Sequence, residues 1–192
     1  MSTTTTATAT STSAPAQTTW KIDPAHSQAE FAIRHLMIST VKGRFGVVNG
    51  TVVTDESDLA KSKIEASIDV SSIHTHEPQR DAHLKSADFF NAEKYPTIDF
   101  RGTRITDVAS DKSEFKLIGD LSIHGVTREV SLQVTSEGRG KDPWGGERAG
   151  FSAHTRIKRS EFGLTWNQAL ETGGFVVGDE VKITIDVELV KQ

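Results

Sequence analysis

The chain has 192 residues, with 22 Lys and Arg, 26 Asp and Glu, and no Cys. This length suits one domain with a short appendage. The lack of cysteine excludes disulfides, thiolate nucleophiles and Cys-ligated zinc. The formal net charge of −4 argues against a nucleic-acid partner, which would require clustered positive charge. A globular protein remains, with either no metal or a metal held by His and carboxylate groups.

The N-terminal segment differs in composition from everything that follows. Residues 1–19 are almost wholly Ser, Thr and Ala, and the first charged side chain is Lys21. Such a segment cannot build a core, so we expect a disordered tail over 1–18 and a folded domain over 19–192. The chain shows neither the pattern of a secretory signal nor an apolar run of about 18 residues. We therefore expect a cytoplasmic protein with no stable membrane insertion.

Apolar and polar side chains alternate with period two in most of the remaining chain, which predicts strands with one buried face. In Ser27–His35, for example, Ala29, Phe31 and Ile33 share one face. About eight strands separated by turns favour an antiparallel sandwich or barrel. The strands are expected near 27–35, 64–70, 115–123, 130–134, 149–157 and 181–189, with shorter candidates over 44–54 and 97–105.

The connections are marked by turn residues and by one helical pattern. Asn49-Gly50 fits a hairpin turn, but we favour a bulge within a longer bent strand. Residues 79–95, between Pro78 and Pro96, have roughly helical spacing and predict one or two short helical pieces. A polar loop is expected over 138–146 and a turn-rich connection over 170–178.

The predicted inward faces mix large aromatic side chains with Ala and Gly. Such a mixture is compatible with a cavity and also with the interlock of large and small residues in a solid core. Residue pattern alone leaves both open.

Several motifs, in order, resemble the YceI-like family of polyisoprenoid-binding barrel proteins, and the resemblance covers about residues 19–189. The motifs are Trp20–Ser27 with Phe31–His35, Gly43–Phe45, Arg80–Ser86 with Asp88–Phe90, Tyr95–Phe100, Gly119–Arg128, Arg159–Gly163, and Leu164–Trp166 with Asn167.

This resemblance implies an all-β fold, an extended eight-stranded antiparallel lipocalin-like barrel with a short helical segment near its mouth. It also implies an apolar tunnel that takes a polyisoprenoid lipid, such as an isoprenoid quinone or a polyprenyl phosphate. We therefore expect a carrier, storage or stress-related protein that is not an enzyme and needs no cofactor beyond the bound lipid. Many family members look exported, whereas this chain shows no export signal. Pairing of two barrels as a homodimer is left open.

The expected tunnel-lining residues are inward apolar side chains of the strands and of the loops near the mouth. They are Phe31, Ile33, Phe45, Ile68, Phe89, Phe90, Phe100, Leu117, Ile123, Phe151, Ala153, Phe162 and Trp166.

Three polar residues are candidates for contact with a lipid head group. His35 continues the face of Phe31, and Arg159 offers forked donors suited to phosphate or a quinone oxygen. Arg80 lies in the expected mouth segment. Each has a structural alternative: an ordinary histidine at a strand end, an ion pair of Arg159 with a carboxylate such as Asp120, and a local network that holds the loop of Arg80.

A metal-dependent enzyme is the competing hypothesis. His74, His76 and His83, together with Glu77 and Asp81, supply imidazoles and carboxylates that zinc accepts. Their spacing does not match a His-Glu-x-x-His helix, and no fixed third-ligand spacing is evident. We regard these histidines as weak metal candidates and favour lipid binding. The chain also lacks the Gly-x-Ser-x-Gly motif of hydrolases in which serine is the nucleophile.

Overall fold

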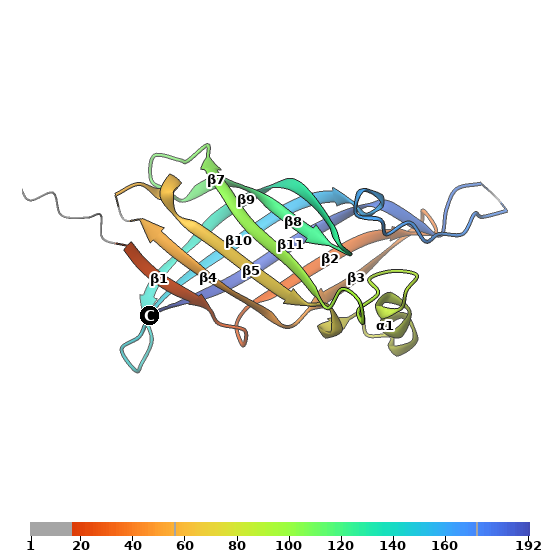
Figure 1. Cartoon of the computed structure of the whole chain (residues 1–192), viewed down its shortest axis with the longest axis horizontal. Helices are drawn as coiled ribbons and strands as arrows, with labels where there is room; N and C mark the ends of the chain where they lie inside the picture. The colour runs from red at the N-terminus through yellow and green to blue at the C-terminus, as the bar shows by residue number, and fades with distance from the viewer. Residues whose placement is uncertain (1–16, 56, 172) are drawn as a thin grey trace, which may run out of the picture.

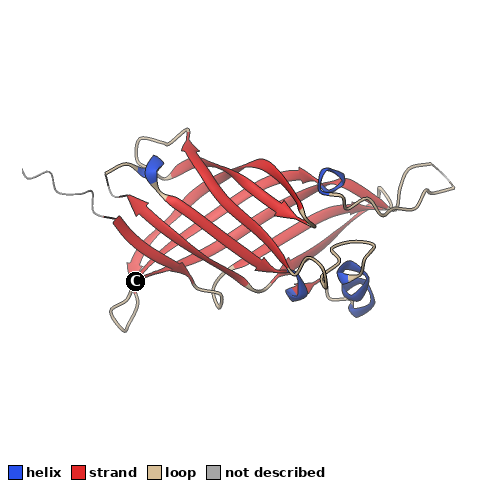
Figure 2. Ribbon diagram, viewed as in Figure 1, coloured by secondary structure: helices blue, strands red, loops and turns tan. Residues whose placement is uncertain are grey.

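The computed structural model describes residues 17–55, 57–171 and 173–192 (Figure 1). Most of the expected tail lies outside these residues, but Gln17 and Thr18 already belong to the first strand. Figure 2 shows a long body of strands with short helices near its ends. No helix in the described part of the chain is long and apolar enough to cross a membrane.

Over the described residues, the chain forms eleven strands, one α-helix and three short 3-10 helices. The strands are β1 (Gln17–Ile22), β2 (Gln28–His35), β3 (Ser39–Phe45), β4 (Val48–Asp55), β5 (Lys63–Asp69), β6 (Ile73–His74), β7 (Thr97–Thr106), β8 (Glu114–Ile123), β9 (Val126–Lys141), β10 (Glu147–Lys158) and β11 (Val177–Lys191). The helices are α1 (Pro78–Lys85), η1 (Leu59–Lys61), η2 (Val70–Ser72) and η3 (Arg159–Phe162).

The sheet closes on itself as an antiparallel barrel. Its neighbours run β1-β4-β5-β7-β8-β9-β10-β11, and β1 pairs with β11 to complete the ring. The other three strands extend this ring toward α1, where β2 pairs with β11, β3 with β2, and β6 with β3. Each of β1–β2, β3–β4 and β5–β6 is thus one long strand with a short interruption. The predicted eight-stranded antiparallel barrel is confirmed.

The interruption between β3 and β4 lies at Gly46 and Val47 and not at Asn49-Gly50. Asn49 and Gly50 pair with Ser67 and Ala66 in an unbroken ladder, so the predicted bulge is wrong. A Cβ atom at residue 50 would collide with the carbonyl oxygen of Glu65. The glycine is therefore needed for the close approach of β5 and not for a turn.

The helical segment is shorter than predicted, and so is the loop between β9 and β10. Helix α1 begins after Glu77, whose carboxylate accepts hydrogen bonds from the backbone N–H groups of Gln79 and Arg80 at 3.1 and 2.5 Å. Turns then carry the chain to β7. The expected loop over 138–146 reduces to a turn at 142–146, because its first residues still pair in the ladder with β10.

Candidate functional site: a cavity along the barrel

A cavity of about 820 Å³ runs inside the barrel. At the α1 end it is lined by Phe90 and Trp166, and at the opposite end by Leu59 and Arg139. Pockets for small ligands usually measure about 300 to 1,000 Å³. The barrel interior is therefore neither a solid core nor a shallow surface cleft, and its shape suits an elongated molecule.

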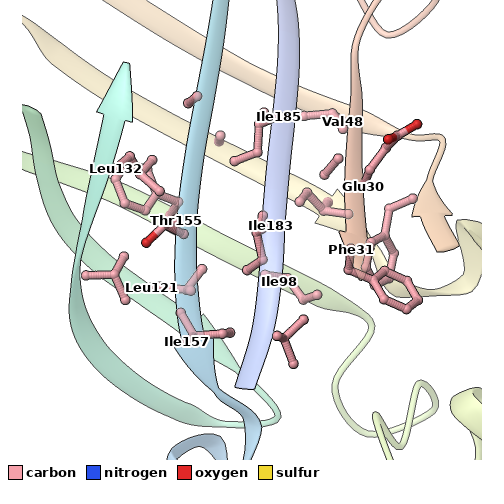
Figure 3. A pocket seen from close by; sticks show the side chains of 18 of the residues that line it. Glu30, Phe31, Val48, Ile98, Leu121, Leu132, Thr155, Ile157, Ile183 and Ile185 are labelled. Carbon is pink, nitrogen blue, oxygen red and sulfur yellow. The ribbon is translucent and has the colours of Figure 1, made fainter. Parts of the chain in front are cut away.

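The lining is overwhelmingly apolar because strand alternation sends every second side chain inward. On β11 these side chains are Val181, Ile183, Ile185, Val187 and Leu189. Figure 3 shows Leu121, Leu132, Ile157, Ile183 and Ile185 arranged around this space. Such a surface offers burial and dispersion contacts, which are not directional and favour chain-like apolar ligands.

The predicted tunnel residues line this cavity, with the exception of Phe162. The residues that do so are Phe31, Ile33, Phe45, Ile68, Phe89, Phe90, Phe100, Leu117, Ile123, Phe151, Ala153 and Trp166. Phe162 is only 1% exposed and packs in a core cluster with Phe45, Val70 and Leu164, outside the cavity wall. Which of the lining residues contact a ligand stays a prediction.

Sequence reasoning missed many aliphatic lining residues. Leu121, Leu132, Ile157, Ile183 and Ile185 all face the cavity. The period-two pattern placed them on inward faces, but the candidate set concentrated on aromatic residues. The same alternation, applied evenly along each strand, would have found them.

Arg159 is a structural residue at the α1 end of the cavity. Its buried guanidinium donates to the backbone carbonyls of Gly178 (2.8 Å), Leu164 (2.5 Å), Trp166 (2.9 Å) and Val177 (3.4 Å). Burial lowers its pKa from the ordinary value, opposed by the nearby negative charge of Asp179. The expected ion pair with Asp120 is not formed. Because most of its donors are engaged, Arg159 has little capacity left for a head group.

The other two head-group candidates also line the cavity at the α1 end. Arg80 is held by Thr75, since its Nε donates to Thr75 Oγ1 and its Nη2 to the Thr75 carbonyl oxygen, both at 2.8 Å. Asp81 accepts from the backbone N–H and the hydroxyl of the same threonine. This network fixes the start of α1 against β6. His35 ends β2 and pairs with Ser39 and Val177 across its two neighbouring strands.

An aromatic cluster lies beside α1, at the end of the cavity that is here called the mouth. The ring centroids of His83 and Phe89 lie 4.8 and 5.1 Å from that of Trp166. Nε2 of His83 also lies 3.0 Å from a carboxylate oxygen of Asp88. All three rings border the cavity, so the mouth presents aromatic edges and faces together with the imidazole of His83.

The structure does not gather the three histidines of the metal hypothesis. His74 and His76 lie together, with ring centroids 4.4 Å apart, but His83 belongs to the aromatic cluster. Among the described residues, the only set whose ligand atoms approach one another closely enough is Asp23, His26 and Glu188. There the guanidinium of Arg148 already donates to both carboxylates. The described residues therefore do not bring His74, His76 and His83 together as one set of ligands.

Comparison with known proteins now places the chain. A model of the YceI-like domain matches residues 20–189. The chain belongs to the YceI-like family. A UPF0312 protein of Staphylococcus aureus is 40% identical over 172 residues, which cover 89% of this chain and 96% of that protein.

Solved structures of YceI-like and related barrels agree with this assignment. The Campylobacter jejuni YCEI protein is 32% identical with a TM-score of 0.69, covering 83% of this chain and 90% of that one. A polyisoprenoid binding domain from Saccharophagus degradans, implicated in plant cell wall breakdown, has the same fold with a TM-score of 0.64. It is 14% identical, with coverage of 90% of this chain and 98% of that one.

Proposed function

We propose that this YceI-like protein binds a polyisoprenoid or another long-chain amphiphilic lipid in its cavity and serves as a carrier or store rather than as an enzyme. The observation that carries the proposal is the cavity itself, about 820 Å³ in volume and lined by inward aliphatic and aromatic side chains along the whole barrel. The polyisoprenoid-binding domain of Saccharophagus degradans, which shares the fold, supports the same ligand class.

Energetics indicate what such a cavity can select. Burial of one CH₂ group contributes about 0.8 kcal/mol, so an isoprene unit of five carbons contributes about 4 kcal/mol before costs. The gain from eight units would exceed about 18 to 21 kcal/mol, the practical upper limit for a non-covalent binding free energy. The cost of ordering the flexible chain must therefore offset much of this gain. We therefore expect selection by chain length inside the barrel and by polarity at its ends. An isoprenoid quinone and a polyprenyl phosphate both meet these requirements.

The α1 end is the side on which we place the polar head group. His35, Arg80 and His83 line the cavity there, beside the rings of Phe89 and Trp166. Arg159 supports this end by holding its loops together. The cytoplasmic location stays a prediction.

Filling the barrel from within tests the proposal. Ala153 on β10 lines the cavity and is buried, so Ala153→Trp should block the middle of the barrel. The neighbouring His154 is exposed on the opposite face of the same strand, so His154→Trp is the matched control. Both proteins would be purified from the same host, and bound lipid would be measured by native mass spectrometry followed by solvent extraction. We expect lipid in wild type and in His154→Trp, and at least tenfold less in folded Ala153→Trp.

Two outcomes would contradict the proposal. One is an undiminished amount of lipid in Ala153→Trp, provided that circular dichroism shows the barrel intact. The other is a wild-type protein that neither carries extractable lipid nor takes up added polyprenyl phosphate or quinone.

A further inference from the structure

Three large apolar side chains are exposed on two adjoining loops at the α1 end of the barrel. They are Met37 (57% exposed), Ile38 (80%) and Phe175 (58%), here called the portal patch. Met37 and Ile38 lie in the turn between β2 and β3, and Phe175 lies just before β11. The two loops touch, because the backbone N–H of Leu36 donates to the Val176 carbonyl oxygen at 2.8 Å. In Figure 1 these loops lie at the end of the long axis that also carries α1.

The turn that presents Met37 has an unusual sequence for its backbone. Leu36 and Met37 have φ values of 50° and 62°. Two central residues with positive φ are typical of a type I′ hairpin turn, in which Asn-Gly is strongly favoured. Leucine and methionine are strained there, and an exposed methionine gives little burial in return. Folding therefore does not explain these apolar residues, which points to a role in contact with something outside the chain.

The portal patch adjoins residues that line the α1 end of the cavity. Arg34 and His35 precede the turn, Val176 and Val177 follow Phe175, and all four line the cavity. Arg34 is exposed and donates from Nη2 to the Met37 carbonyl oxygen at 2.7 Å. An apolar surface with one cation at its edge thus adjoins the lining of an apolar interior.

We propose that the portal patch docks on the surface of a lipid bilayer, so that apolar ligand passes between the membrane and the cavity. The proposal rests on the proposed lipid-binding function, because a long apolar chain has its main store in membranes and crosses water poorly. Met37, Ile38 and Phe175 enter the boundary between head groups and acyl chains, and Arg34 lies at the level of the phosphates. Three side chains give a reversible contact, which suits exchange.

Vesicle binding by the full chain tests the docking. The protein would be floated with vesicles made of equal parts phosphatidylcholine and phosphatidylglycerol. The test variants are Met37→Asp and Ile38→Asp. The matched control is Trp144→Asp, since Trp144 is 87% exposed but lies in the turn at the opposite end of the barrel. We expect a loss of vesicle binding of about tenfold in each test variant, because a charge replaces an inserted apolar group, and no loss in the control.

A second measurement separates docking from ligand binding. Nile red, an apolar fluorescent dye, would be added from ethanol without vesicles and then offered from dye-loaded vesicles. Ile38→Asp should bind the dye from ethanol like wild type but take it up from vesicles about tenfold more slowly.

Each remaining outcome has a definite meaning. Failure of wild type to bind the dye from either source contradicts the proposed function. Binding of the dye from ethanol without any vesicle binding overturns the docking proposal alone, as does an equal loss in Trp144→Asp. If Met37→Asp instead converts a dimer into a monomer in size-exclusion chromatography and vesicle binding stays unchanged, the patch is an interface between copies of this chain and docking is overturned.

Discussion

Two arginines organise opposite ends of the barrel in opposite ways. Arg159, at the α1 end, is buried and donates to backbone carbonyls of the surrounding loops. Arg148, near the turn between β9 and β10, is half-buried and donates to the carboxylates of Asp23, Asp142 and Glu188. Burial lowers the pKa of Arg159, whereas the carboxylates raise the pKa of Arg148.

The difference reflects what each end must hold. At the α1 end the chain leaves the regular ladder at η3 and returns only at β11, so several carbonyl groups lack strand partners. One planar cation donates to four carbonyls here, those of Leu164 and Trp166 between these elements and those of Val177 and Gly178 at the start of β11. At the other end the β9–β10 ladder continues to its turn, with one register shift between Gly150 and Phe151. There Arg148 ties the outer faces of β10 and β11 to the connection after β1 through charge. The mouth thus depends on hydrogen bonds from a side chain to backbone carbonyls, whereas the opposite end depends on ion pairs.

The largest expected effect is at the α1 end. Arg159→Met should lower the free energy of unfolding by about 3 to 5 kcal/mol, because it removes the buried guanidinium that donates to four backbone carbonyls. Urea unfolding monitored by circular dichroism would measure it. Arg156→Met is the control, since Arg156 forms only an exposed pair with Glu180 at 2.8 Å, worth under about 1 kcal/mol. Equal effects of the two substitutions would show that Arg159 does not organise the mouth.

A smaller and pH-dependent effect is expected at the opposite end. Hydrogen bonds from His26 and Arg148 lower the pKa of Asp23 from 3.8 to about 2. Since the pKa is lower in the folded state, this stabilisation is complete above about pH 4 and is lost as the pH falls toward about 2. Asp23→Asn should therefore cost about 1 to 2 kcal/mol at neutral pH and almost nothing at pH 2. Urea unfolding of both proteins across this range is the measurement, and a cost that persists undiminished at the lowest pH would refute the ion-pair account.

The smallest expected effect has the opposite sign. Replacing Leu36-Met37 by Asn-Gly should raise the free energy of unfolding by about 1 kcal/mol, because these residues accept positive φ without strain. Thermal unfolding would show it as a higher midpoint. The same double variant should bind vesicles more weakly, so stability and membrane contact would change in opposite directions. A lower midpoint would mean that the apolar turn serves the fold after all.

How far the sequence predicted the fold depends on the element. The alternations over 149–157 and 181–189 identified β10 and β11, because a barrel strand has one face inward and one outward. The Asn49-Gly50 pair misled, since the same two residues suit a turn, a bulge or a close strand contact. Only the neighbouring backbone of Glu65 shows which applies.

Part of the candidate site could also be predicted from the sequence, and part could not. The inward positions of Phe31 and Phe151 follow from alternation, and both line the cavity. The partners of Arg159 could not be predicted, because backbone carbonyls carry no residue-specific mark in the sequence. The separation of His83 from His74 and His76 could likewise not be predicted, since it depends on how α1 packs against Trp166.

The sequence by itself determined the strands, their inward faces and the family, because each of these is written in local periodicity and in ordered motifs. Tertiary structure alone decided that the strand segments close into one eight-stranded barrel, that the interior stays open along its length, and that Met37, Ile38 and Phe175 lie on adjoining loops at its α1 end. The physical reason is that closure, cavity and patch arise from contacts between residues far apart in the chain, and such contacts leave no local pattern.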